Sequence, residues 1–192
     1  PDLPNNFSTK KIIKIELLDD ITTISNETFS NSNWLIKKWN NLKTVELSNI
    51  ITIGDKAFKD CTSLDTINLN INNLITISNE AFSGCTSLQE ITITPNIKTI
   101  GDSAFEGCEN LHTVDLQISF TFQSISRIRT RTFKNCNSLE KIDFATIVDI
   151  EDYAFYDCKS LESLSSDMVK TIGKYALIGS GAFATSSSLG FG

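Results

Sequence analysis

The sequence lacks most of the features from which a catalytic function is usually inferred. Its 192 residues include one histidine, and they contain no P-loop, zinc-protease or nucleophile-elbow motif. No stretch approaches the ~18 consecutive apolar residues that a membrane-spanning helix needs. Acidic residues outnumber basic ones by 23 to 17, which gives a net charge of −6, whereas a nucleic-acid-binding protein needs a basic surface. We therefore expect no membrane-spanning segment and no nucleic-acid partner.

What the sequence does contain is internal repetition. A motif of about 23 residues recurs seven times, and a period between about 20 and 50 residues is typical of a solenoid. The central position of the seven copies is occupied by Phe29, Phe58, Phe82, Phe105, Phe133, Phe155 and Leu177. Three residues later, five copies carry Cys61, Cys85, Cys108, Cys136 and Cys158. A leucine follows three residues after the cysteine, and an isoleucine lies five residues before the central position. These columns predict the side chains that face the interior.

Two short strands are expected in each coil. Segments such as Leu88-x-x-Ile91-x-Ile93 match the leucine-rich-repeat strand, in which Ile91 and Ile93 point inward and Thr92 points outward. The Ile-x-Thr-Ile segments are β-branched and predict a second strand on the other side of the coil. The stretch 102–108 is too short for a full helix, so we expect one helical or 3₁₀ turn there. One coil buries too little apolar surface to fold alone, so stacking on its neighbours stabilises the array.

The expected fold class is a repeat solenoid, a right-handed, β-rich leucine-rich-repeat superhelix of parallel short strands. It has a concave sheet, a second short strand per coil and few helical turns. We assign residues 1–11 to an N-terminal edge or linker, residues 12–178 to a solenoid of about seven repeats, and residues 179–192 to a non-repeat C-terminal tail. Two segments, within 30–38 and 117–124, break the period, and such insertions emerge as loops on one face.

The combination I-G-x-x-A-F-x-x-C-x-x-L-x-x-I-x-L resembles the BspA-like class of leucine-rich repeats. Its best matches begin at Ile53 and at Ile100, and the resemblance covers roughly residues 12–178. Members of that family are typically surface or secreted proteins of bacteria and parasitic protists, and some bind host matrix proteins such as fibronectin and fibrinogen. The resemblance therefore implies an extracellular or cell-surface location and a protein ligand. In four copies the glycine of the motif is replaced, by Ser25, Ser78, Arg129 and Glu151. These substitutions indicate that the glycine position does not require a positive φ.

The cysteine column leaves three interpretations open: disulfides, a metal site or buried free thiols. Cysteines one coil apart have parallel side chains, so their Cα atoms come near enough for a disulfide but their Cβ vectors do not converge. A straight column also fails to give the tetrahedral geometry of a zinc site. We favour five free thiols acting as small apolar side chains, which explains why Trp39 and Ser180 occupy this column in the other two copies. We expect neither a metal nor a cofactor.

The outward positions of the concave sheet are the first candidate for a binding site. They carry eight acidic side chains and three lysines, which leaves this face with a net charge of −5. The candidate ligand-binding residues on it are Glu46, Asp65, Glu90, His112, Asp115, Glu140 and Asp143. Such a face is either a solvated surface kept soluble by its charge or a docking face for a basic partner.

The second candidate is a bulge that follows the insertion at 117–124. The insertion carries Phe120 and Phe122, and all three arginines of the protein come directly after it, at Arg127, Arg129 and Arg131. Arginine and aromatic side chains together are typical of binding hot spots. The alternative is a solvated turn whose phenylalanines fold back over the coil.

The repeat architecture predicts a protein-binding module, and the resemblance to BspA-like repeats implies that it is a cell-surface or secreted protein that adheres to host or matrix proteins. Two alternatives are a structural spacer in a larger surface protein and a recognition scaffold for an enzyme domain outside this sequence. We expect no enzymatic activity, because an active site needs several different groups converging in a pocket, whereas stacked coils present columns of similar ones.

Overall fold

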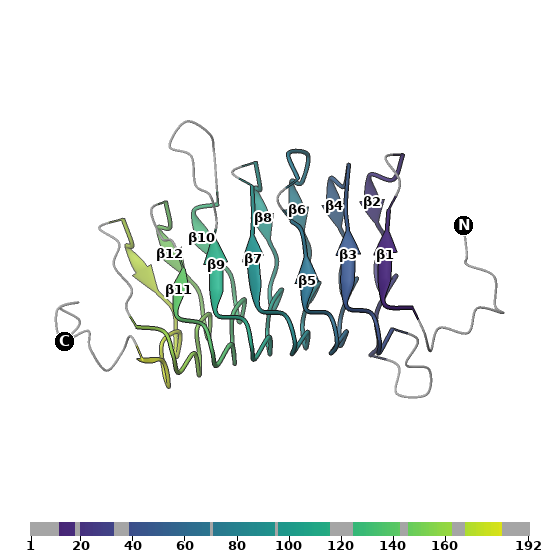
Figure 1. The fold of residues 1–192 in the computed structure, drawn as a ribbon. Helices are drawn as coiled ribbons and strands as arrows, with labels where there is room; N and C mark the ends of the chain where they lie inside the picture. The colour runs from purple at the N-terminus through teal and green to yellow at the C-terminus, as the bar shows by residue number, and fades with distance from the viewer. Residues whose placement is uncertain are drawn as a thin grey trace.

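Short strands from successive coils line up in two separate rows (Figure 1). The structure, a computed structural model, describes residues 12–17, 20–32, 39–69, 71–94, 96–115, 125–142, 146–162 and 168–181. The first row contains β1 (Lys14–Glu16), β3 (Thr44–Glu46), β5 (Thr66–Ile67), β7 (Glu90–Thr92), β9 (Thr113–Asp115) and β11 (Lys141–Ile142). The second row contains β2 (Thr23–Ile24), β4 (Thr52–Ile53), β6 (Thr76–Ile77), β8 (Thr99–Ile100), β10 (Arg127–Ile128), β12 (Asp149–Ile150) and β13 (Thr171–Ile172).

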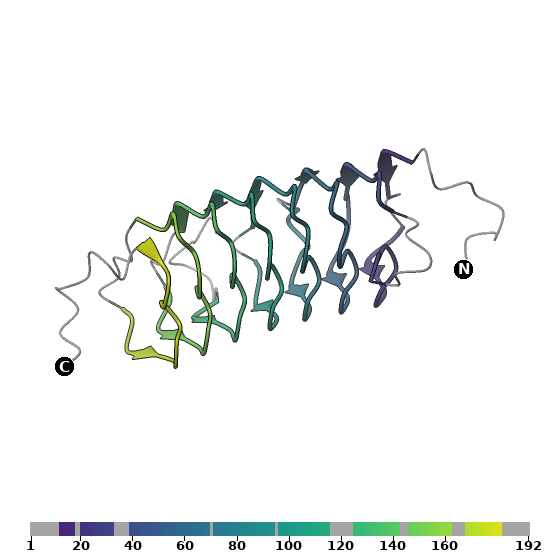
Figure 2. The same cartoon turned by 90° about the horizontal axis from the view of Figure 1, so that it is seen from below.

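The strand pattern confirms the predicted fold class. Every strand pair is parallel, the coils stack along one axis, and no helix is assigned among the elements of the described residues (Figure 2). Along β7 and the residue that follows it the side chains alternate as expected, because Ile91 and Ile93 are buried while Glu90 is exposed. We call the outward side of the first row the concave face.

Within the described residues, each row is interrupted once. The first row consists of two three-stranded sheets, β1-β3-β5 and β7-β9-β11, and the second row consists of β2-β4-β6-β8 and β10-β12-β13. The interruption between β8 and β10 coincides with the insertion at 117–124, which precedes β10 in the chain. The interruption between β5 and β7 has no insertion of that length beside it, so the repeat period does not reveal it.

The turn that joins the two strands of a coil differs from the expected helical or 3₁₀ turn over 102–108. Bonds of the 3₁₀ type are present, because Glu106 N–H donates to Ser103 O (3.1 Å) and Cys108 N–H donates to Phe105 O (3.2 Å). However, Ser103 has a φ of 55° and Gly107 a φ of 74°, whereas a helix needs a negative φ. The segment is therefore a series of turns. The position two residues before the central one is left-handed in every copy, at Glu27, Lys56, Glu80, Ser103, Arg131, Tyr153 and Tyr175.

The left-handed backbone at Ser103 gives a prediction with opposite signs for two substitutions. A non-glycine residue in this conformation costs about 1–2 kcal/mol, so Ser103→Gly relieves backbone strain in the folded protein. Glycine also makes the unfolded chain more flexible, which favours unfolding and offsets part of this gain. We expect Ser103→Gly to change the free energy of unfolding by less than about 1 kcal/mol, toward greater stability. Ser103→Val should lower it by about 1–2 kcal/mol, because a β-branched residue with positive φ is strained further. Urea unfolding of both variants checks this, and an equal loss in both would contradict it.

Asparagine and aspartate side chains connect successive coils. Asn26 Oδ1 accepts the N–H of Asp55 (2.9 Å), Asp55 Oδ1 accepts that of Asn79 (3.0 Å), and Asn79 Oδ1 accepts that of Asp102 (2.9 Å). A Cβ atom on Gly101 would lie 2.6 Å from the Asn79 backbone nitrogen, and the φ of this glycine is not positive. The glycine of the motif thus permits close approach between coils, which agrees with the expectation that it does not require positive φ.

The core is built from columns that run through all the coils. Each of the central phenylalanine rings stacks on the next at 5.1–5.6 Å between ring centroids. In the first copy Trp39 is buried against the Phe29 ring at 5.1 Å in an edge-to-face arrangement. The Leu42 N–H donates to Trp39 O at 3.0 Å, as the Leu64 N–H does to Cys61 O. Trp39 therefore replaces cysteine in its column, as the alignment of the copies predicted.

Candidate functional site

All five cysteines are free and buried, which confirms the interpretation as free thiols. The thiols also donate hydrogen bonds, which was not predicted. Each S–H donates to the central phenylalanine carbonyl of the preceding coil, at 3.0–3.2 Å, in the pairs Cys61–Phe29, Cys85–Phe58, Cys108–Phe82, Cys136–Phe105 and Cys158–Phe133. Burial raises the pKa of the Cys61, Cys108 and Cys158 thiols to about 12 and that of Cys85 and Cys136 well above the ordinary value. Because a thiolate is the reactive form, burial holds these thiols in the unreactive protonated form, and they form a structural column.

A thiol count tests this arrangement directly. In the native protein at pH 8, a thiol reagent should label no cysteine, because all five are buried and protonated. After denaturation without reductant the same reagent should label five. Fewer than five labelled thiols after denaturation would indicate a disulfide, and labelling of the native protein would contradict the burial.

The acidic residues predicted for the concave face lie along the first row of strands. Glu46 lies on β3, Glu90 on β7 and Asp115 on β9, while Asp65 and Glu140 immediately precede β5 and β11. Glu46 is partly neutralised, because its Oε1 atom lies 2.6 Å from Lys14 Nζ on the neighbouring strand. Hydrogen bonding to Glu46 raises the pKa of Lys14 above its ordinary value, which favours the charged form of this lysine.

Of the two further residues predicted for this face, only His112 lies among the described residues. His112 precedes β9, and its Nδ1 atom lies 3.1 Å from Asn110 O. Since a carbonyl oxygen can only accept, Nδ1 carries the proton. Asp143 lies outside the described residues. The structure therefore brings the acids together as a row, one coil apart, and the histidine joins the row without a catalytic partner among the described residues.

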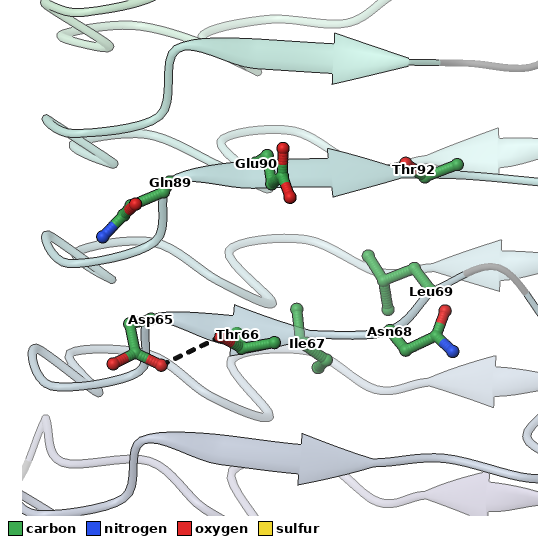
Figure 3. Close-up of a pocket in the computed structure, with 8 residues that line it drawn as sticks. All are labelled: Asp65, Thr66, Ile67, Asn68, Leu69, Gln89, Glu90 and Thr92. Atoms are coloured by element: carbon green, nitrogen blue, oxygen red, sulfur yellow. Dashed lines mark hydrogen bonds between the residues drawn. The ribbon is translucent and has the colours of Figure 1, made fainter.

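A groove of about 400 Å³ lies on the concave face where β5 and β7 do not pair (Figure 3). It is lined by Asp65, Thr66, Ile67, Asn68, Leu69, Gln89, Glu90 and Thr92. Asp65 and Gln89 lie at the beginnings of the two strands, and Glu90 and Thr92 follow along β7 (Figure 3). The Asp65 carboxylate accepts a hydrogen bond from Thr66 Oγ1 at 3.0 Å. Asp65 and Glu90 were both predicted as ligand-binding residues, but their position on either side of a groove was not.

The groove leaves main-chain atoms of both strands without their usual partners. In the intact part of the row, Thr44 N–H donates to Ile13 O and Thr66 N–H to Lys43 O, at 3.1 Å each. The same pattern between β5 and β7 would join Glu90 N–H to Asp65 O, but these strands belong to different sheets and no such bond forms. Two strand edges thus meet in one groove, and an unpaired strand edge is a site for contacts with another chain.

The arginines of the predicted bulge are held largely by ion pairs with neighbouring coils. The Arg127 Nη2 atom lies 3.2 Å from an Asp149 oxygen, and Arg127 Nε lies 3.4 Å from Glu151 Oε1. Arg129 Nε lies 2.8 Å from Asp102 Oδ1. These pairs are partly exposed, and each stabilises the fold by no more than about 1 kcal/mol.

Of the other three residues predicted for the bulge, only Arg131 lies among the described residues. Phe120 and Phe122 lie outside the described residues, so their role in a contact site stays a prediction. The guanidinium carbon of Arg131 lies 5.6 Å from the centre of the Tyr153 ring, a cation–π contact. Tyr153 in turn lies 5.1 Å from Tyr175 and 5.7 Å from Tyr156, so all three tyrosines of the protein gather beside Arg131. Sequence reasoning missed this cluster, although the one-coil spacing of Arg131, Tyr153 and Tyr175 is a signal that could have found it.

The described residues hold no group of three or more His, Cys, Asp or Glu side chains arranged to bind a metal ion. Within the same part of the chain, no helix has the length and hydropathy needed to cross a membrane.

Comparison with known families identifies the family to which the repeats belong. A family model described as a BspA type leucine rich repeat region matches residues 4–126 and 116–189, in six copies. The chain belongs to the BspA-type leucine-rich-repeat family. Repeats of this kind are typically protein-interaction scaffolds, in which stacked coils provide an extended concave surface. No curated protein matches the sequence.

Solved structures similar to this BspA-type protein are bacterial leucine-rich-repeat proteins. A leucine-rich-repeat protein of T. pallidum is 22% identical with a TM-score of 0.64, and the match covers 94% of this chain and 85% of that one. One from Bacteroides ovatus is 23% identical, with a TM-score of 0.61 and coverage of 88% and 50%. A leucine rich cell surface protein of Faecalibacterium prausnitzii is 23% identical, with a TM-score of 0.54 and coverage of 81% and 48%. The chain thus spans about half the length of the last two, and at these identities the similarity establishes the fold alone.

Proposed function

We propose that this BspA-type protein is a cell-surface or secreted protein-binding module that docks a basic protein partner on its concave face. The observation that carries the proposal is the row of acidic side chains on this face together with the groove between Asp65 and Glu90. A surface of one sign steers an oppositely charged partner and selects against others. Partners on host or matrix surfaces and a role in adhesion are part of the proposal.

The proposed location draws on the relatives of this fold. One similar structure is described as a leucine rich cell surface protein. An extracellular location also agrees with the burial of all five thiols, since exposed thiols would oxidise in that environment.

The test compares two triple variants of equal charge change. The concave variant is Asp65→Asn, Glu90→Gln and Glu140→Gln, and the control variant is Asp20→Asn, Glu27→Gln and Glu109→Gln, three exposed acids that lie on no strand of the first row. Binding is measured by surface plasmon resonance against immobilised matrix proteins, including fibronectin and fibrinogen, at two salt concentrations. We expect the concave variant to associate about three- to tenfold more slowly at low salt, and the control to change far less. Equal effects in both variants would contradict docking on this face.

The same panel separates the alternatives. A spacer would bind none of the proteins at any salt concentration, whereas a binding module binds at least one. If Arg131→Ala weakens binding while the concave variant does not, the contact lies on the tyrosine and arginine cluster. Arg131 is the informative arginine, because Arg127 and Arg129 are held in ion pairs whose loss would also affect the fold.

A further inference from the structure

The groove between β5 and β7 has the composition of a receptor for one basic side chain. Its walls carry the carboxylates of Asp65 and Glu90, one from each strand. Among the described residues, no lysine or arginine nitrogen lies within ion-pair distance of either carboxylate. The concave acid on the neighbouring strand, Glu46, is by contrast paired with Lys14. The groove therefore combines negative charge with carboxylates that are not already neutralised by the fold.

The floor and edge of the groove suit the rest of such a side chain. Ile67 and Leu69 line it and are 4% and 0% exposed, so they form an apolar base against which an alkyl stem can pack. The carbonyl groups of Asp65 and Ile67 lie on the unpaired edge of β5, where the register of the intact pairs directs them toward β7. A backbone carbonyl accepts hydrogen bonds only, which matches an ammonium or guanidinium group that donates only.

We propose that this groove binds a lysine or arginine side chain projecting from the partner protein. The cationic group lies between the Asp65 and Glu90 carboxylates and donates to the free carbonyl groups of Asp65 and Ile67. The proposal rests on the function proposed above and names the chemistry that the partner brings to this position.

Two competing occupants fit the groove less well. A divalent cation would need more ligands than two carboxylates, and no metal-binding group of three side chains exists in the described residues. If a whole strand were inserted, β5 and β7 would have to lie two strand spacings apart, at ~4.8 Å per spacing. The coils are instead joined on both sides of the groove, because Phe58 N–H donates to Ala81 O (2.8 Å) and Thr76 N–H donates to Ile51 O (3.2 Å). A single side chain, which enters from above the sheet, avoids this cost.

The test uses the full chain labelled with ¹⁵N and two short blocked peptides. One peptide is acetyl-Gly-Gly-Arg-Gly-Gly-amide, and the other carries citrulline, the neutral isostere, in place of arginine. We expect the arginine peptide to shift the backbone amide signals of residues 65–69 and 89–92, with millimolar affinity. The citrulline peptide should bind at least about tenfold more weakly, because it lacks the charge-assisted hydrogen bonds.

Matched variants complete the experiment. Asp65→Asn with Glu90→Gln should weaken binding of the arginine peptide about tenfold, while Glu16→Gln with Glu140→Gln, which removes the same charge elsewhere on the concave face, should leave it within about twofold. The single variant Glu90→Gln, at an exposed side chain, gives the same answer if the double variant fails to fold. Absence of shifts, equal shifts with citrulline, or shifts spread evenly over the face would overturn the proposal.

The outcomes also distinguish this proposal from the broader one. If matrix proteins bind the concave face but the groove variants have no effect on the peptide, the docking function stands and the groove assignment is wrong. If the peptide binds in the groove while no matrix protein binds, the groove assignment stands and the proposed class of partner is wrong.

Discussion

Between about pH 9 and pH 11 the protein is expected to unfold as its five thiols lose their protons. In the unfolded chain a cysteine thiol has a pKa of about 8.5. In the folded protein burial raises the pKa of the Cys61, Cys108 and Cys158 thiols to about 12. It also raises the pKa of the Cys85 and Cys136 thiols well above the ordinary value. Below the unfolded pKa both states are protonated and the full stability is present. Above it the unfolded state alone releases protons, so the stability falls.

The size of the effect follows from the number of thiols. Each thiol that ionises only in the unfolded state lowers the free energy of unfolding by about 1.4 kcal/mol per pH unit. Five thiols acting together lower it by about 7 kcal/mol per pH unit, which is comparable to the whole stability of a typical domain at about 5–15 kcal/mol. The measurement is urea unfolding, followed by circular dichroism, at intervals from pH 7 to pH 10.5.

Serine provides the matched control for this prediction. It retains a donor for the phenylalanine carbonyl of the preceding coil but does not ionise in this range. A variant with Cys85, Cys108 and Cys136 replaced by serine should therefore lose stability with a slope reduced to about two-fifths, whatever its stability at pH 7. The tyrosine and lysine side chains are identical in the two proteins, so the difference between the two slopes reports the thiols. If the slopes of the two proteins agree, the buried thiols do not govern alkaline unfolding.

Replacing Phe105 by alanine is expected to lower the free energy of unfolding by about 3–5 kcal/mol. The side chain is fully buried, and its ring stacks on Phe82 at 5.4 Å and on Phe133 at 5.6 Å. Removal of the ring leaves a cavity in the middle of the column, and both neighbouring rings lose a contact. Because repeat arrays are stabilised mainly by contacts between adjacent coils, the loss falls on the contacts of two coil boundaries.

Two comparisons make this result interpretable. Phe105→Leu keeps most of the volume and should cost about 1–2 kcal/mol. Leu177→Ala, in the last copy of the same column, should cost less than Phe105→Ala, because Leu177 is 6% exposed whereas Phe105 is fully buried. A loss below about 1 kcal/mol for Phe105→Ala would show that the phenylalanine column is not core.

The sequence was sufficient to predict the coil because its determinants are side-chain columns. Burial of Phe58, Cys61 and Leu64 repeats at a fixed spacing, and each type of side chain fits one place in the coil. The two rows of strands followed from β-branched residues in the same register. The acidic concave face followed from alternation along the strand, which assigns Asp65 and Glu90 to the outward side without reference to tertiary structure.

What the sequence did not predict depends on backbone geometry and on contacts between coils. The left-handed position before the central phenylalanine is occupied by residues as different as Lys56, Ser103 and Tyr153, so no residue type marks it. The groove was hidden because the strand around Ile91 has the same pattern as its neighbours. The pairing of Arg129 with Asp102 depends on the register of adjacent coils across an insertion, which local patterns do not specify.

The staggered interruption of the two rows determines how the molecule resists force along its length. Where β5 and β7 are unpaired, β4 and β6 remain joined, and where β8 and β10 are unpaired, β9 and β11 remain joined. The two interruptions fall between different pairs of coils, so among the described strands no pair of neighbouring coils is unpaired in both rows. To separate the coils at either interruption, a force along the axis must break the main-chain hydrogen bonds of the row that is still paired there. One row can therefore open locally while the other keeps the two coils together. Under the proposed function a partner would dock where β5 and β7 are unpaired, while β4 and β6 in the second row keep the same two coils joined.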